Sequence, residues 1–101
     1  MHRTGQIGPG TRVKWHADQI TAEIDGQMVV MGLLQGKYVG FDGMASEIWR
    51  RLEHSQTVSE LCDGLVRDFE GDGAVIAQDT TDLISRLCEY GLVDIEAGGA
   101  E

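Results

Sequence analysis

The chain has 101 residues, 42% of them hydrophobic and 25% charged, which is ordinary for one small globular domain with a single core. No apolar run approaches the ~20 residues that a membrane-spanning helix needs, and the polar, glycine-rich start lacks the apolar segment of a secretory signal, so we expect a cytoplasmic protein. The net charge is −9, and residues 53–101 carry twelve acidic and only two basic side chains, which argues against partners with phosphate backbones or anionic lipid surfaces.

The two ends of the chain are expected to differ from its middle. Residues 1–12 contain three glycines and the only proline, which interrupt regular structure, so we predict a flexible lead-in there. A folded domain is expected over residues 13–96, beginning with a short strand or extended arm at Val13–His16. Residues 97–101 are expected to form a disordered tail.

A three-stranded antiparallel meander is predicted next. Between residues 20 and 24 apolar and polar side chains alternate, which is the period-two pattern of a half-buried strand. Asp25-Gly26 supplies a two-residue hairpin turn, the run Met28–Met31 is apolar on both faces as in a central strand, and a turn at Gln35-Gly36 leads into Lys37–Phe41. The alternating apolar residues of the first strand, expected to face the core, are Ile20, Ala22 and Ile24.

Three helices follow, because the apolar spacing changes from two residues to that of an α-helix. The first carries Ala45, Ile48, Trp49 and Leu52 on one face. The second opens with a capping box, Thr57-Val58-Ser59-Glu60, and its apolar stripe continues through Leu61, Cys62, Leu65 and Phe69.

The third helix is predicted to follow a glycine-containing turn, with Asp72 as its N-cap and Gly91 as the residue after its end. Its inward side chains are Ile76, Leu83, Ile84, Leu87 and Cys88. The apolar residues after Gly91 are expected to lie back on the core as a short extended segment. Three antiparallel strands followed by three helices define an α+β fold of the winged helix-turn-helix type.

Two cysteines, Cys62 and Cys88, and three histidines are the candidates for metal or redox chemistry. The cysteines have apolar neighbours at helical spacing, which is typical of buried thiols that pack as small hydrophobes. The histidines are scattered, and two isolated cysteines do not complete a zinc site. No nucleophile has a base beside it in the sequence. We therefore predict no catalytic residues, no metal and no cofactor, so that the chain is not an enzyme.

A winged helix-turn-helix scaffold often binds DNA, and charge bears on that alternative. The candidate recognition helix, Val75–Tyr90, exposes four charged residues that sum to −2, namely Asp79, Asp82, Arg86 and Glu89. A helix that reads DNA needs Lys or Arg for the phosphates and Arg, Asn or Gln for the base edges. The sequence thus disfavours DNA binding.

A peptide-binding interpretation uses the same scaffold differently. Lys37–Phe41 is expected to be an edge strand, whose unpaired backbone groups are a template for another extended chain, with the third helix as the second wall of a groove. From periodicity alone, a covered edge and a solvated helix face explain the pattern as well. The residues predicted to bind the peptide are Lys37, Tyr38, Val39, Gly40, Phe41, Asp79, Asp82, Leu83, Arg86 and Tyr90.

Five short motifs between about Ile20 and Val93 resemble, in their order, those of a known family. They are Gly36-Lys37-Tyr38, Phe41-Asp42, Ile48-Trp49, Thr57-Val58 with Glu60-Leu61, and Leu87 with Gly91-Leu92-Val93. In order and spacing they resemble PqqD-like domains. Two positions depart from that pattern: Val39 where a second aromatic is frequent, and Phe41 where leucine is commoner. Both remain apolar, so they bear on peptide specificity more than on the fold.

The resemblance implies a RiPP recognition element, which binds the leader segment of a ribosomally synthesised precursor peptide and presents it to modifying enzymes. A stand-alone domain of this size is most similar to the leader-binding proteins of lasso-peptide biosynthesis. The resemblance implies three partners, namely the precursor leader, a separate transglutaminase-like leader peptidase and a lasso cyclase that acts afterwards. The alternative within the family is the peptide chaperone of a radical-SAM maturase, as in pyrroloquinoline quinone biosynthesis.

Overall fold

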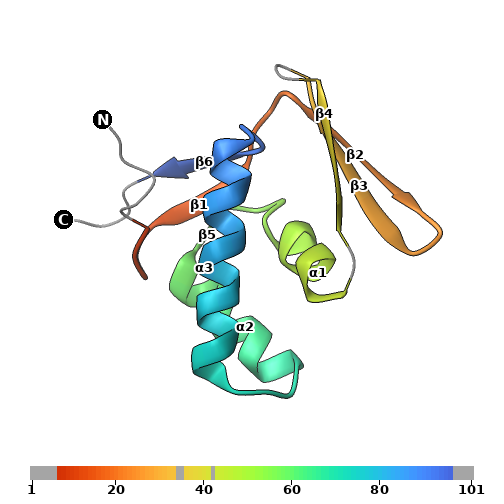
Figure 1. The fold of residues 1–101 in the computed structure, drawn as a ribbon. Helices are drawn as coiled ribbons and strands as arrows, with labels where there is room; N and C mark the ends of the chain where they lie inside the picture. The colour runs from red at the N-terminus through yellow and green to blue at the C-terminus, as the bar shows by residue number, and fades with distance from the viewer. Residues whose placement is uncertain (1–6, 34–35, 42, 97–101) are drawn as a thin grey trace.

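The computed structural model describes residues 7–33, 36–41 and 43–96 (Figure 1). The predictions for residues 1–6 and 97–101, for Gln35 and for Asp42 lie outside the described residues. The elements in chain order are β1 (Arg12–Trp15), β2 (Gln19–Ile24), β3 (Gln27–Gly32), β4 (Lys37–Phe41), α1 (Gly43–Arg51), β5 (Gln56–Thr57), α2 (Val58–Asp68), α3 (Gly73–Glu89) and β6 (Val93–Glu96).

The predicted meander is the sheet β2-β3-β4, in which both neighbouring pairs are antiparallel. Asp25 and Gly26 both have positive φ, 54° and 80°, as a type I′ hairpin turn requires. Glycine adopts that conformation without strain, and aspartate is among the few other residues that tolerate it. The dipeptide therefore fixes the register of the first hairpin, and the α+β fold with its three-stranded sheet and three helices is confirmed.

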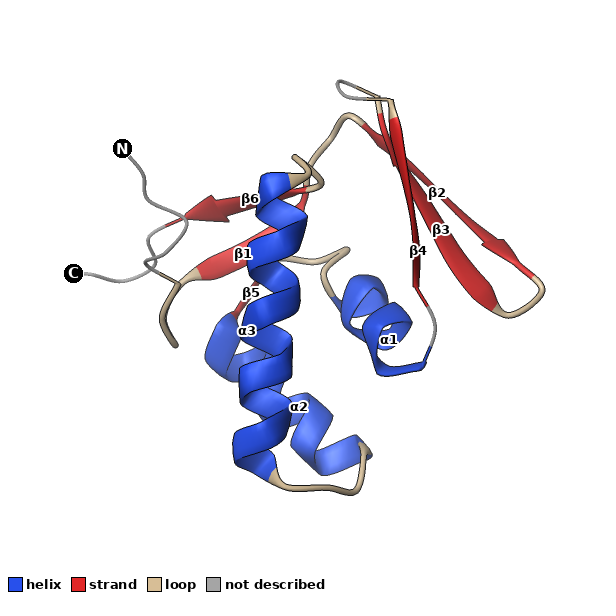
Figure 2. Cartoon of the chain, in the orientation of Figure 1, coloured by secondary structure: helices blue, strands red, loops and turns tan. Residues whose placement is uncertain are grey.

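A second small sheet, β5-β1-β6, was not predicted as a unit. Its central strand is β1, which pairs antiparallel with β6 from Arg12↔Glu96 to Trp15↔Val93. The expectation that the segment after Gly91 lies back on the core is confirmed, since Val93 is buried and β6 closes the edge of this sheet. The two sheets flank the helices at different sides of the molecule (Figure 2).

The helix boundaries follow the predicted caps. Thr57 and Glu60 form both hydrogen bonds of the capping box, at 3.0 Å each, and Asp72 caps α3 by accepting from the N–H of Ala74. Phe69 is the C-cap of α2, with an extended backbone after the helix ends at Asp68. Its N–H donates to the Leu65 carbonyl and its side chain packs against the core, so it continues the predicted stripe. Gly91 follows α3 with φ of +73°, a position where glycine ends helices readily.

An aromatic stack centred on Trp49 joins the two sheets. The fully buried Trp49 ring of α1 stacks on Trp15 of β1 at a centroid distance of 5.0 Å and on Phe41 of β4 at 5.8 Å. Trp15 Nε1 donates to the Trp49 carbonyl at 2.8 Å, and Trp49 Nε1 donates to Thr21 Oγ1 of β2 at 3.0 Å. Burying Trp49 and Phe41, half-burying Trp15 and satisfying both indole donors fixes how the hairpin sheet sits on the helices.

One face assignment from sequence was wrong. Ile20, Ala22 and Ile24 are exposed, and the half-buried residue of this strand that contacts the core is Thr21. The alternation correctly predicted a strand, but its polar face packs toward α1. Thr21 pairs with the buried Val30 of β3 and accepts a hydrogen bond from the Trp49 indole. The core side of the sheet is completed by residues of β3 and β4, namely Met28, Val30 and Phe41.

Part of the predicted lead-in is described by the structure. The carbonyls of Pro9 and Thr11 accept hydrogen bonds from the N–H groups of Ser59 and Val58 at 2.9 Å each, so this segment lies along the start of α2. Thr11 is buried there, and β1 begins at the next residue, Arg12. The domain boundaries at residues 13 and 96 stay a prediction.

Candidate functional site

The outer strand of the hairpin sheet, β4, is hydrogen-bonded to β3 along one side only, and the described residues place no strand on its other side. Its residues alternate, with Phe41 buried and Val39 half-buried toward the helices while Tyr38 and Gly40 are exposed. The prediction that Lys37–Phe41 is an edge strand is confirmed. Such an edge carries unpaired N–H and C=O groups.

Side chains of β4 and α3 enclose a first pocket, of about 190 Å³, next to this edge. The floor is apolar, and Arg86 and Tyr90 bring the polar groups at its rim. The residues that line it are Val39, Gly40, Phe41, Ala45, Leu83, Arg86, Leu87 and Tyr90.

A second pocket, of about 290 Å³, lies between α1 and the middle of α3. It shares Ala45, Leu83 and Arg86 with the first, so the two pockets are neighbours along one groove. Its other lining residues are Met44, Ile48, Asp79 and Asp82. We call the two pockets together the β4–α3 groove. Each is at or below the ~300–1,000 Å³ of pockets for drug-sized ligands, so each suits one or two side chains rather than a large cofactor.

Eight of the ten residues predicted to bind a peptide line this groove. They are Val39, Gly40, Phe41, Asp79, Asp82, Leu83, Arg86 and Tyr90. Lys37 and Tyr38 do not line it, and Tyr38 lies on the opposite face of the sheet from Val39 and Phe41, because side chains alternate along a strand. Their part in binding stays a prediction.

The groove also contains residues that sequence reasoning placed only in the core or did not single out. Met44, Ala45 and Ile48 extend it along α1, and Leu87 contributes to its floor. The helical stripe of α1 predicted that these side chains face inward. No local signal indicated that part of the stripe would remain open between α1 and α3.

The charges of the groove are available to a ligand. The ion pairs among the described residues do not include Asp79, Asp82 or Arg86, although Asp82 and Arg86 are four residues apart on α3. Asp82 accepts a hydrogen bond from Gln78 Nε2 at 3.0 Å, and all three charged side chains are exposed. The groove thus has an acidic end at Asp79 and Asp82 and a cation near its middle.

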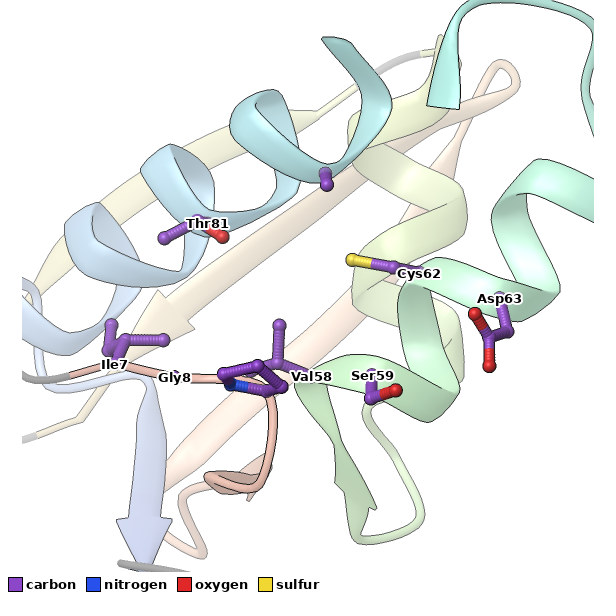
Figure 3. Close-up of a pocket in the computed structure, with 9 residues that line it drawn as sticks. Ile7, Gly8, Val58, Ser59, Cys62, Asp63 and Thr81 are labelled. Atoms are coloured by element: carbon purple, nitrogen blue, oxygen red, sulfur yellow. The ribbon is translucent and has the colours of Figure 1, made fainter. Parts of the chain in front are cut away.

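A separate pocket of about 240 Å³ lies between residues 7–9, α2 and α3, with Cys62 at its wall (Figure 3). Burial raises the pKa of the Cys62 thiol, the neighbouring Thr80 hydroxyl lowers it less, and the charge of Asp63 raises it further. Burial also raises the pKa of Cys88 to about 11, with the charges of Glu89 and Asp94 adding to the effect. Both thiols are therefore protonated near neutral pH, the opposite of an activated nucleophile.

The described residues offer neither a metal-binding cluster nor a membrane-spanning helix. Within residues 7–33, 36–41 and 43–96, no three His, Cys, Asp or Glu side chains lie together as metal ligands would. No helix in the described part of the chain has both the length and the apolar character to cross a bilayer.

The sequence and the fold are both similar to those of known proteins. Residues 27–93 match the family model described as coenzyme PQQ synthesis protein D (PqqD). The match covers more than half of the chain, from β3 to the start of β6. The chain therefore belongs to the PqqD family, as its motifs predicted. Membership also confirms the prediction that this is a binding domain without catalytic activity. No curated protein sequence matches it closely enough to count as a relative.

Two solved structures share the fold. TbiB1 in complex with the TbiA(beta) leader peptide is 27% identical, with a TM-score of 0.73 over 87% of this chain and 99% of that one. Lasso peptide synthetase B1 complexed with the leader peptide is 21% identical, with a TM-score of 0.69 over 81% of this chain and 96% of that one. At 21% identity, the second similarity shows only that the fold is shared.

Proposed function

We propose that this domain binds the leader segment of a ribosomally synthesised precursor peptide in the β4–α3 groove, as a strand added antiparallel to β4. The observation that carries the proposal is an open strand edge that lines one pocket and continues into a second, both with an apolar floor and charged side chains at the rim. Main-chain hydrogen bonds to the edge provide affinity for any extended chain, and the pockets select side chains. The likeness to TbiB1, which was solved with a leader peptide, supports it.

The arrangement of the groove predicts the direction of the bound leader. The groove runs from Val39 past Phe41 to α1. Along it the lining residues of α3 are met in reverse order, from Tyr90 near Val39 to Asp79 near α1. A strand antiparallel to β4 therefore begins at the α1 end, near Asp79, and ends near Lys37. Every second leader side chain enters the groove, at a spacing of roughly 6.8 Å.

The charges of the groove predict which leaders bind well. Asp79 and Asp82 flank the pocket at the α1 end, where we expect a basic or neutral leader side chain toward the peptide's N-terminal end. The cation of Arg86 lies farther along and favours an acidic or carbonyl-rich neighbour. An acidic residue opposite the two aspartates is disfavoured by like-charge repulsion.

The domain acts, in this proposal, as an adaptor in the cytoplasm. It holds the leader for a separate transglutaminase-like leader peptidase, and a lasso cyclase then acts on the released core. Bringing substrate and enzyme together raises their effective concentration to ~mM without chemistry by the adaptor. The alternative adaptor role is that of a peptide chaperone for a radical-SAM maturase, and the class of enzyme encoded beside the precursor discriminates the two.

The binding test compares two charge reversals on different helices. Arg86→Glu in the groove should weaken binding of a fluorescently labelled leader at least tenfold by anisotropy, because it adds a third acidic group to the groove. The matched control is Arg67→Glu on α2, whose side chain is 74% exposed and does not line the groove. Equal affinities of the two variants would contradict the proposed site.

Backbone amides provide the second readout. On addition of leader, amides of β4 should show large NMR shift changes and slower hydrogen exchange, because strand addition pairs them. Changes that cluster on α2 instead would show that the peptide binds elsewhere. Retention of duplex DNA in a gel shift with sequence dependence would favour the winged-helix DNA-binding alternative, which the exposed Asp79, Asp82 and Glu89 of α3 disfavour.

The adaptor role itself is tested by leader cleavage. The domain should accelerate cleavage by the peptidase when precursor is dilute, and the gain should vanish when precursor saturates the peptidase. Acceleration that persists at saturating precursor indicates allosteric activation of the peptidase instead. Cleavage by the domain alone would refute the adaptor role.

A further inference from the structure

The strand β2 forms the second edge of the hairpin sheet, on the side opposite to β4. Among the described residues no strand pairs with the outer side of β2, since the strand order is β2-β3-β4. Thr21 and Glu23 contact α1 on the inner face of the sheet, through Trp49 and Arg50. The other side, which faces away from α1, we call the outer face. It is an exposed or half-buried patch of eight uncharged residues, namely Ile20, Ala22, Ile24, Gln27, Val29, Met31, Tyr38 and Gly40.

The β2 edge lacks the features that usually prevent an exposed edge from pairing with another strand. Such features are lysine, proline, a bulge or an uncompensated charge. β2 contains neither lysine nor proline, and its ladder with β3 has no bulge. Its single charged residue, Glu23, is neutralised by Arg50 at 3.0 Å. The edge strand β6 of the other sheet, by contrast, carries two exposed acidic residues. The β2 edge is therefore open to another strand.

The hairpin turn fixes which backbone groups of β2 point outward. A two-residue turn joins β2 to β3, so Ile24, which flanks the turn, is hydrogen-bonded to its partner on β3. Hydrogen-bonded pairs recur at every second residue of an antiparallel ladder, so Ala22 also directs its backbone groups toward β3. The N–H and C=O groups of Thr21 and Glu23 consequently point away from the sheet, toward any strand that is added there.

The sequence of this edge is symmetric about Ala22, with a polar residue on each side of it and then an isoleucine on each side. An antiparallel pair of two β2 strands centred on Ala22 places Ile20 opposite the second copy's Ile24, and Ala22 opposite itself. Thr21 and the second copy's Glu23 then exchange the hydrogen bonds of their outward backbone groups. A centre at Glu23 would instead oppose two carboxylates, and a centre at Thr21 would leave Ile24 without a partner. The strand is thus self-complementary in one register.

Charge and size indicate a weak, reversible pair. Residues 1–52, which include the whole hairpin sheet, carry six basic and five acidic side chains, so this part of the chain is nearly neutral. The acidic excess lies in residues 53–101, and physiological salt screens the long-range repulsion between two such halves. Five cross-strand pairs bury well under the ~800 Å² per partner of a stable interface, so the pair should be transient.

From this symmetry we propose that β2 pairs with the β2 strand of a second copy of the chain, antiparallel and centred on Ala22. The product is one six-stranded sheet whose two outermost strands are the β4 strands of the two copies. Both β4 edges stay open, so the dimer presents two β4–α3 grooves at opposite ends of one sheet. The pairing goes beyond the proposed function and does not depend on it.

The first test separates a backbone effect from a side-chain effect at one position. Sedimentation velocity of the wild-type chain should show reversible self-association between ~10 µM and ~1 mM protein, the range of weak interfaces. Glu23→Pro removes an outward N–H without breaking the ladder to β3, so the dissociation constant should rise at least tenfold. The matched control is Glu23→Ala, which loses the ion pair with Arg50 but keeps the N–H and should stay within threefold of wild type. Circular dichroism should show both variants folded.

The second test identifies the register of the pair. Ala22→Lys and Ala22→Glu each place like charges opposite one another at the centre, so each variant alone should be monomeric over the same range of concentration. An equal mixture of the two variants places opposite charges there and should associate at least as tightly as wild type. Only a centre at Ala22 opposes this residue to itself, so recovery in the mixture identifies that register.

Three outcomes would overturn the dimer. They are a wild-type protein that stays monomeric throughout, self-association that Glu23→Pro leaves unchanged, and a mixture of the two Ala22 variants that does not associate. Leader affinity, measured by anisotropy where the protein is monomeric, should be the same for Glu23→Pro and wild type, because β4 is the opposite edge of the sheet.

Discussion

The two faces of the sheet β2-β3-β4 are built from the same three strands and similar side chains, yet they have opposite environments. On the inner face Met28, Val30 and Phe41 are buried against Trp49 and its neighbours. On the outer face Ile20 and Ile24 are more than half exposed. Apolar character alone therefore does not decide burial here. The buried face combines Met28, Val30 and Phe41 of β3 and β4 with Thr21 of β2, which pairs with Val30 and accepts a hydrogen bond from the Trp49 indole.

The two faces of this small domain serve stability and partner binding separately. The inner face and the aromatic stack provide the stability, since they bury large rings and satisfy their N–H donors. The outer face and the β4 edge contribute little to stability and remain available for partners. Mutations on the two faces should accordingly separate loss of folding from loss of function.

Removing the centre of the inner face should have the largest effect. Trp49→Ala leaves a cavity between Trp15 and Phe41, so we expect a loss of about 3–5 kcal/mol in the free energy of unfolding by urea titration. The matched truncation on the outer face, Tyr38→Ala, should change stability by less than about 0.5 kcal/mol. Similar losses for the two variants would mean that the outer face is also structural.

Replacing one glycine on each face by alanine tests the same difference between the inner and outer faces with a single added methyl group. A Cβ added at Gly32 on the inner face would lie 3.0 Å from Cδ2 of the buried Leu92, so Gly32→Ala should destabilise by about 1–3 kcal/mol. A Cβ added at Gly40 on the outer face meets nothing closer than 3.7 Å, on the Gln27 side chain. Gly40→Ala should be neutral, or stabilise by ~0.4–1 kcal/mol through the unfolded chain. Thermal unfolding of both variants checks the difference, and the opposite order would reverse the assignment of the faces.

The hydrogen bond that orients β2 should have a smaller effect. Thr21→Val keeps the side-chain shape but leaves Trp49 Nε1 without its acceptor, so we expect a loss of about 1–2 kcal/mol. A change in the near-ultraviolet circular dichroism of the tryptophans should accompany it. Thr21→Ser, which retains the hydroxyl, serves as the control and should recover most of that stability.

The outer face should respond least. Ile24→Val removes one methylene from a side chain that is 55% exposed, so the free energy of unfolding should change by no more than about 0.5 kcal/mol. The corresponding shortening in the core is Ile48→Val, at a buried position of α1, which should lose about 0.5–1.5 kcal/mol. Chemical unfolding of the pair measures both values, and a larger loss at Ile24 would show that the patch is covered in the folded protein.

Local sequence determined most of the elements of this protein. Asp25-Gly26 fixed the first hairpin through its positive φ angles, and the capping box at Thr57 fixed where α2 begins. The change in apolar period separated the strands from the helices, and the order of the meander made Lys37–Phe41 an edge. Eight of ten predicted binding residues line the groove. They could be predicted because strand alternation and helical spacing depend only on residues a few positions apart.

Tertiary structure decided what local patterns leave open. Period-two alternation shows that a strand has two unlike faces but not which one is buried. Here pairing with β3 places Thr21 beside the buried Val30 and the distant Trp49, and leaves Ile20 and Ile24 exposed. The pairing of β1 with β6 joins residues some 80 positions apart, beyond the reach of any local signal. The opening between α1 and α3 likewise depends on how two helices pack, because the same inward stripe lines either a closed core or a groove.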